Sequence, residues 1–173
     1  HFCSRDAMDI EGLGPAIFET FVNVGMINKT YDIYNLDPDK IASLEGFKQT
    51  SAKNIINSVN NSKKNDLSKL IFALGIRHIG AKAGKLLADH FKNIDAIMNA
   101  SVDDILKIDG FGVVMAQSVV EFFESDSSKE LIEKLKEVGV NMISTNVIKD
   151  NRFEGMTFVL TGTLPTLKRS EAS

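Results

Sequence analysis

Apolar residues recur along most of this chain at intervals of three or four positions, which is the spacing of one face of an α-helix. Ala52, Ile55, Ile56 and Val59 form one such stripe, and polar residues fill the positions between them. Comparable stripes lie at 17–22, 41–44, 52–59, 67–74, 83–91, 102–106, 116–123 and 131–138. The pattern therefore predicts an all-α domain over residues 1–140.

Four turns between these helical stretches share one form, which is glycine, an apolar residue and glycine, with one substitution in two of the copies. Their first positions fall 34, 32 and 32 residues apart. The four turns are Gly12-Leu13-Gly14, Gly46-Phe47-Lys48, His78-Ile79-Gly80 and Gly110-Phe111-Gly112. A fixed period of this length indicates repeated supersecondary units, here four helical hairpins.

The composition of the turns indicates what they contact. Glycine accepts a positive φ and carries no Cβ, so we expect both glycines to let backbone N–H groups point outward at the start of the next helix. The helix dipole favours an anion there, and the apolar middle residue is expected to anchor the turn in the core. These features are typical of a helix-hairpin-helix motif that binds nucleic-acid phosphate. A helical repeat whose glycines only end helices is the alternative.

Two copies depart from the pattern. Lys48 stands at the second glycine position of the second turn, where we expect a side-chain contact to replace a backbone contact. His78 stands at the first position of the third turn, and two interpretations stay open for it: a donor to phosphate, or a residue that packs at a helix end.

Basic residues are concentrated around the second and third turns. Residues 44–92 carry nine basic and three acidic side chains, net +6, although the whole chain has a net charge of −3. The flanking ranges 1–43 and 93–152 are acidic, with net charges of −4 and −5. Such a block favours phosphate binding, so hairpins two and three are expected to dominate affinity. Scattered lysines on a solvated surface are the alternative.

The remaining sequence predicts a change of structure after residue 140. Residues 141–152 lack periodicity and are interpreted as a linker, and 153–173 hold the first strand signal, Phe158-Val159-Leu160. Thr161 and Gly162 follow this strand and offer either a phosphate-binding turn or a plain strand-to-helix turn.

Composition narrows the function classes. No apolar run reaches the roughly 18 residues that a membrane helix needs, and no signal peptide is evident, so we expect a cytoplasmic location. Because the chain begins at His1, it is expected to be an excised fragment. The single cysteine, Cys3, excludes an internal disulfide and is expected to be packed rather than reactive. No His, Cys, Asp or Glu cluster has metal-ligand spacing, so no metal site is predicted.

Two enzyme motifs match only superficially. Lys107-Ile108-Asp109-Gly110 fits the K-x-D-G nucleophile motif of covalent nucleotidyltransferases, but the strands and nucleotide pocket that lower the lysine pKa are not evident around it. Asp95, which lies 15 residues past Gly80, has the place of a glycosylase aspartate, but one base-flipping pocket would not explain four hairpins. No catalytic residue is predicted in this chain.

Three segments resemble bacterial NAD-dependent DNA ligases. His1 to Gly14 is similar to the segment that joins the zinc finger of that family to its first hairpin. Leu74 to Gly80 resembles the third hairpin, and Phe158 to Pro165 resembles the first strand of the C-terminal BRCT domain. The resemblance covers essentially the whole chain, departing at Lys48 and in the incomplete BRCT segment.

The resemblance implies that the four hairpins grip nicked double-stranded DNA, in replication and repair, while a catalytic domain outside this sequence seals the nick. It also implies NAD, Mg and Zn for the parent protein, with no cofactor in this fragment, which would be inactive alone. We expect no membrane partner and a monomer. The predicted DNA contacts are Gly12, Leu13, Gly14, Gly46, Phe47, Lys48, Lys53, Arg77, His78, Ile79, Gly80, Lys82, Lys85, Gly110, Phe111 and Gly112.

Two other functions remain open from the sequence. One is a non-enzymatic tandem-hairpin DNA-binding module of a nuclease or recombination complex. The other is a protein-interaction scaffold whose turns never meet DNA.

Overall fold

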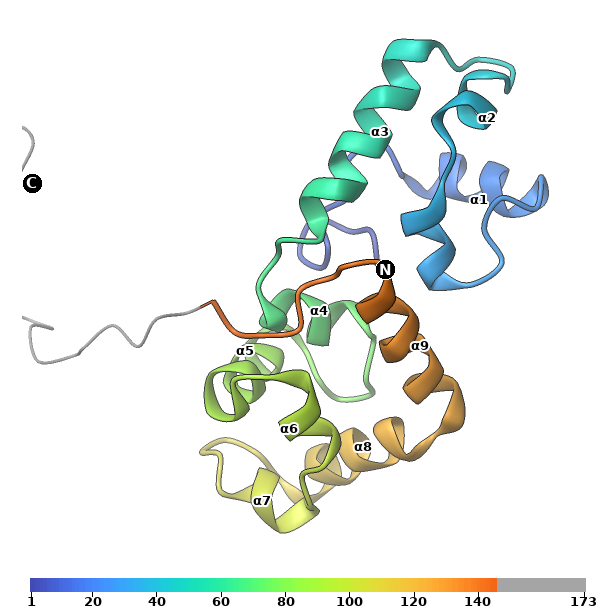
Figure 1. Ribbon diagram of the computed structural model, residues 1–173. Coiled ribbons are helices and arrows are strands. Elements are labelled where there is room, and N and C mark those ends of the chain that lie inside the picture. The colour runs from blue at the N-terminus through green and yellow to red at the C-terminus, as the bar shows by residue number, and fades with distance from the viewer. Residues whose placement is uncertain (146–173) are drawn as a thin grey trace, which may run out of the picture.

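The computed structural model describes residues 1–145, and every regular element in that range is helical (Figure 1). The all-α prediction is therefore confirmed. The predicted strand at 158–160, with Thr161 and Gly162, lies outside the described residues. The elements are α1 (Pro15–Asn23), the 3-10 helix η1 (Thr30–Asn35), α2 (Pro38–Ala42), α3 (Gln49–Ser62), α4 (Leu67–Ala73), α5 (Ala81–Phe91), α6 (Ile94–Met98), α7 (Val102–Leu106), α8 (Val113–Glu124) and α9 (Asp126–Glu137).

Helix ends follow local sequence signals. Asp37 caps α2 by accepting a hydrogen bond from the backbone N–H of Asp39, and Pro38 begins the helix. Ser101 and Asp104 form a capping box at the start of α7. Beyond α9, Gly139 takes a φ of 88°, the left-handed conformation that ends helices.

The helices form two groups that are joined at the end of α3 (Figure 1). The first group contains α1, η1, α2 and the long helix α3, and the second contains α4 to α9. A single set of buried apolar side chains runs through both groups, from Met8 and Phe21 to Ile132 and Leu135. The Tyr31 hydroxyl of η1 also donates a hydrogen bond of 3.3 Å to the Glu130 carboxylate of α9, which links the groups at the surface.

The first hairpin differs from the prediction. No helix precedes Gly12 in the described chain, because residues 1–13 form turns closed by short-range backbone hydrogen bonds such as Ala7 N–H to Ser4 O at 3.0 Å. Met8 and Ile10 are nevertheless buried, so this segment contributes side chains to the core where a helix was predicted. The sequence also did not predict the short helices η1 and α6.

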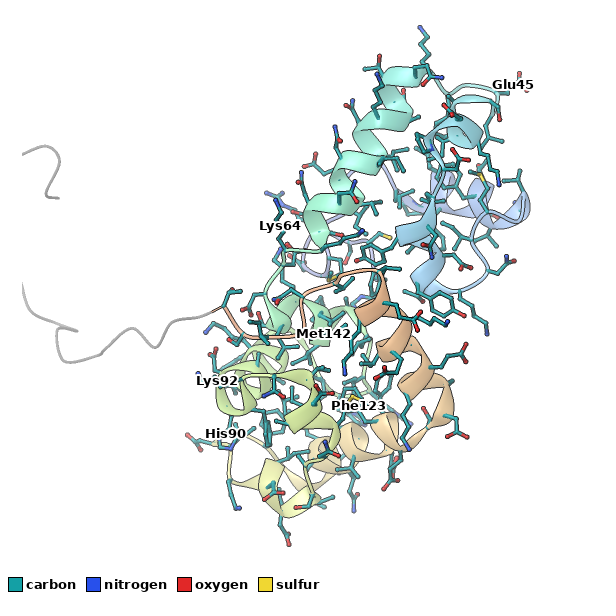
Figure 2. All side chains as sticks on the ribbon, viewed as in Figure 1. Glu45, Lys64, His90, Lys92, Phe123 and Met142 are labelled. Carbon is teal, nitrogen blue, oxygen red and sulfur yellow. The ribbon has the colours of Figure 1, made fainter. Side chains whose placement is uncertain are left out.

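A short segment after α9, residues 141–145, crosses back over the second group. The Ile143 carbonyl accepts a hydrogen bond from Leu67 N–H at 3.3 Å, and the Met142 carbonyl accepts one from Ile94 N–H at 3.0 Å. The backbone N–H of Thr145 donates to the Asp66 carboxylate at 2.6 Å. We call residues 141–145 the strap. The strap lies within the range that the sequence analysis interprets as a linker, but it packs against the helices. Figure 2 shows Met142 among the side chains of the second group.

Candidate nucleic-acid interface

The four predicted turns share one backbone conformation at their first residue. Each first residue has a positive φ: 87° at Gly12, 85° at Gly46, 66° at His78 and 89° at Gly110. The middle residue then donates its N–H to the carbonyl three residues earlier, as Ile79 does to Ile76 at 3.0 Å. His78 adopts the left-handed conformation that glycine takes elsewhere, and its side chain is exposed rather than packed at a helix end.

The third residue of each turn, where the second glycine is expected, behaves differently from the prediction. Gly14, Lys48, Gly80 and Gly112 have φ values of −65°, −117°, −85° and −94°, and each is the N-cap of the following helix. Positive φ is therefore needed only at the first position, which explains why Lys48 fits. A Cβ added to Gly14, Gly80 or Gly112 would meet nothing within 4 Å. Neither the backbone nor the neighbouring atoms require glycine there, so its absent side chain leaves space for an outside group.

The apolar middle residues anchor the turns as expected. Leu13, Ile79 and Phe111 are buried in the core. Phe47 is half-buried, with its ring centroid 5.6 Å from that of Phe21 on α1. Each anchor holds the adjoining N-cap residue at the surface, since Gly14, Lys48, Gly80 and Gly112 are all exposed.

The helices fall into two classes by the way they begin. A side chain caps α2, α4, α6, α7 and α9 by accepting a backbone N–H; these caps are Asp37, Asp66, Asn93, Ser101 and Ser125. The four helices that follow the hairpin turns, α1, α3, α5 and α8, have no side-chain cap. Every uncapped α-helix of the described chain is thus a hairpin helix.

In the third hairpin, the absence of a side-chain cap leaves several backbone N–H groups without a partner in residues 1–145. The first hydrogen bond of α5 runs from Gly84 N–H to the Gly80 carbonyl at 2.9 Å. The N–H groups of Gly80, Ala81 and Lys82 have no partner within the described residues. Three exposed donors at the positive end of a helix make an anion-binding arrangement.

The predicted basic side chains are exposed around hairpins two and three. Lys48, Lys53, Arg77 and Lys82 form no ion pair within residues 1–145. Lys85 is engaged instead, because its Nζ lies 2.8 Å from an Asp89 oxygen, and this hydrogen-bonded pair raises the pKa of Lys85. Lys64 and Lys92 project from the ends of α3 and α5 (Figure 2).

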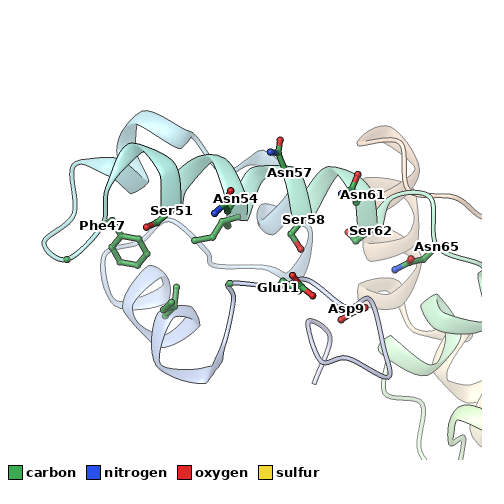
Figure 3. A pocket seen from close by; sticks show the side chains of 14 residues that line it. Asp9, Glu11, Phe47, Ser51, Asn54, Asn57, Ser58, Asn61, Ser62 and Asn65 are labelled. Atoms are coloured by element: carbon green, nitrogen blue, oxygen red, sulfur yellow. The ribbon is translucent and has the colours of Figure 1, made fainter.

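The first two hairpins share a groove of about 970 Å³ whose wall the sequence reasoning missed (Figure 3). Gly12, Gly46 and Phe47 all line the groove, so the structure brings turns one and two together. The long wall is the polar face of α3; its side chains are Ser51, Asn54, Asn57, Ser58, Asn61 and Ser62. The spacing of Asn and Ser at three or four residues within Gln49–Ser62 is the signal that would have revealed this face.

The remaining candidate groups have structural surroundings that account for them. Lys107 Nζ lies 3.0 Å from an Asp104 oxygen, and both side chains are exposed. Burial raises the pKa of the Cys3 thiol to about 11, which fits a packed side chain. Within residues 1–145, no group of three or more His, Cys, Asp or Glu side chains is placed to hold a metal ion, and no helix is long and apolar enough to span a membrane.

Comparisons with known proteins agree with this geometry. A family described as "SAM-like Helix-hairpin-helix tandem" matches residues 4–61, and one described as "Helix-hairpin-helix motif" matches residues 69–132. A DNA ligase of Acetivibrio thermocellus is 49% identical over 99% of this chain. DNA ligases of Clostridioides difficile and Carboxydothermus hydrogenoformans are 47% and 46% identical, again over 99% of the chain.

The chain belongs to the DNA ligase family. It spans 26% of the length of each of these three ligases. The two matched ranges contain turns one and two and turns three and four, respectively, so the ligase relationship and the hairpin geometry concern the same residues.

Proposed function

We propose that this chain is the part of an NAD-dependent DNA ligase that grips nicked duplex DNA during replication and repair in the cytoplasm. The N-terminal amides of α1, α3, α5 and α8 donate to backbone phosphates, and the basic side chains around hairpins two and three add attraction. Contacts of this kind position a protein on DNA and carry little sequence information, which suits an enzyme that seals nicks in any sequence.

One observation carries the proposal. Side-chain caps are present on the five α-helices that do not follow a hairpin turn and absent from the four that do. A helix with a glycine N-cap, as in α1, α5 and α8, forgoes a few tenths of a kcal/mol relative to a side-chain cap. A phosphate that binds the same N–H groups would supply the missing partner.

The sealing chemistry belongs outside this sequence. The described residues offer no site that fits Mg or Zn, and the single cysteine cannot form a four-cysteine zinc site. We therefore assign NAD, Mg and Zn to other parts of the ligase and expect this chain alone to have no ligation activity. Residues 153–173 are proposed to begin a BRCT domain.

The test introduces a side-chain cap at the N-terminus of α5, the helix that follows the third hairpin turn. Gly80→Asp fits the observed φ of −85° and ψ of −176°, its Cβ would meet no atom within 4 Å, and an N-cap aspartate offers its carboxylate to the N–H groups of α5. The helix should be as stable as before, or more stable by a few tenths of a kcal/mol. Binding to a nicked duplex should weaken by about 10- to 100-fold, because a charged hydrogen-bonded partner is displaced and repelled.

Ser125→Asp is the matched control, because it adds the same charge at the N-cap of α9, a helix that already has a side-chain cap. Its DNA affinity should change by less than about twofold, since the charge lies at the opposite end of α8 from the fourth hairpin turn, about 18 Å along the helix, and is screened by salt. Equal losses in the two variants, with melting temperatures preserved, would contradict the proposal.

A further inference from the structure

Hairpin four has an apolar tip, unlike hairpin three. Val113 and Val114 are the first two residues of α8, and 53% and 61% of their surfaces are exposed. Val114 is the most exposed of the large apolar side chains in residues 1–145. Isolated exposed valines are common, but these two are adjacent and border an uncapped helix start.

The two hairpins present equivalent positions. Gly80 and Gly112 have nearly the same N-cap backbone, with φ/ψ of −85°/−176° and −94°/170°. The first helical hydrogen bond measures 2.9 Å in α5 and 3.0 Å in α8. Lys82 is the second residue of α5 and Val114 is the second residue of α8, so a DNA strand that reaches Lys82 in one hairpin reaches Val114 in the other.

The charges near hairpin four make phosphate attraction weak there. Asp109 is exposed directly before Gly110, Asp103 is exposed on the preceding helix α7, and Lys107 already pairs with Asp104 at 3.0 Å. At the same time, a Cβ added to Gly110 or Gly112 would meet nothing within 4 Å, so the approach to the tip is open. The tip is accessible, and the side chains that begin α8 there are uncharged, which favours contact with an uncharged part of the DNA strand.

We infer that Val113 and Val114 pack against the deoxyribose of the duplex DNA strand that hairpin four holds. The carbon edge of the sugar is the apolar surface next to each phosphate, and it lies within reach of side chains on the residues whose amides are proposed to bind phosphate. This inference rests on the proposed DNA-binding function. The two hairpins then contribute different interactions. Hairpin three supplies salt-sensitive attraction through Lys82, and hairpin four supplies an apolar contact that salt does not screen.

The experiment measures the affinity of the full 173-residue chain for a nicked duplex over a series of KCl concentrations. Val113→Ala with Val114→Ala should weaken binding by about 5- to 20-fold at every salt concentration, because buried methyl contacts are lost. The slope of log K against log salt should not change. Lys82→Ala should weaken binding and make the slope shallower by about 1.

Val22→Ala with Val24→Ala is the matched control, because these valines are 43% and 49% exposed at the other end of a hairpin helix, α1. This pair should leave affinity unchanged. Melting temperatures and sedimentation of all variants establish that fold and oligomeric state are preserved.

The outcomes are separable. Unchanged binding by the Val113/Val114 variant, beside a weakened Lys82 variant, would overturn this inference and leave the DNA-binding function standing. A shallower salt slope in the valine variant, or a change in its self-association, would also overturn the inference. Unchanged binding in the Lys82 variant as well would count against the proposed function itself.

Discussion

The two glycines of the first turn meet different physical demands. Gly12 has a φ of 87°, and a Cβ placed on it would lie 2.8 Å from Ile55 Cγ1. Gly14 has a φ of −65° and open space around it. The first glycine is therefore fixed by the fold, whereas the second is free to serve a ligand. The same division separates Gly110 from Gly112 in the fourth turn.

This division predicts unequal costs for one substitution. Gly12→Ala should lower the free energy of unfolding by about 2–4 kcal/mol, because the left-handed backbone and the contact with Ile55 are both unfavourable for alanine. Gly14→Ala should cost only about 0.5–1 kcal/mol, through a poorer N-cap. Urea denaturation of the two variants measures the difference. Similar losses at the two positions would show that the roles assigned to the glycines are wrong.

At the scale of elements, Asp66 joins two segments that are far apart in the sequence. Its carboxylate caps α4 by accepting the Ser68 N–H at 2.8 Å, and it also accepts the Thr145 N–H of the strap at 2.6 Å. Partial burial acts to raise the pKa of Asp66, but the hydrogen bonds from Ser68 and Thr145 outweigh it and lower the pKa from 3.8 to about 2. The ionised carboxylate is thus the form that holds the strap.

The direction of this shift predicts how stability changes in acid. Because the pKa is lower in the folded state, the stabilisation is complete above the unfolded-state value of 3.8 and is lost as the pH falls toward about 2. Asp66→Asn keeps an N-cap but removes this titration, so its free energy of unfolding should decrease less between pH 4 and pH 2 than that of the unchanged protein. Urea titrations across that range measure the difference, and parallel curves would contradict the role of Asp66.

At the scale of the whole molecule, the sequence predicted the helices and the four turns because both depend on local signals. The stripe from Ala52 to Val59 and the anchor Phe111 required no knowledge of the rest of the chain. The strap was not predicted, because its bonds join backbone groups from distant segments, such as Ile143 and Leu67. The negative φ at the third turn residue was also missed, because glycine accepts a φ of either sign and only Lys48 indicated a negative one.

The α-helices of the described chain divide into two classes by whether a side chain caps their first turn. Sequence reasoning located the four turns, and the structure adds that the helices after them lack side-chain caps. The capped starts of α2, α4, α6, α7 and α9 form a comparison set within the same molecule. If the uncapped amides bind phosphate, adding DNA to the unchanged protein should perturb the N-terminal amides of the uncapped helices and leave those of the capped helices unaffected.

The most direct measurement is a titration of the ¹⁵N-labelled 173-residue chain with a nicked duplex, followed by amide NMR spectra. The account predicts large shifts for the amides that begin the uncapped helices, including Gly80, Ala81 and Lys82, and small shifts for capped amides such as Asp39 and Ser68. Shifts concentrated at the capped helix starts, with the hairpin amides unmoved, would contradict the claim that the hairpin turns receive the DNA backbone.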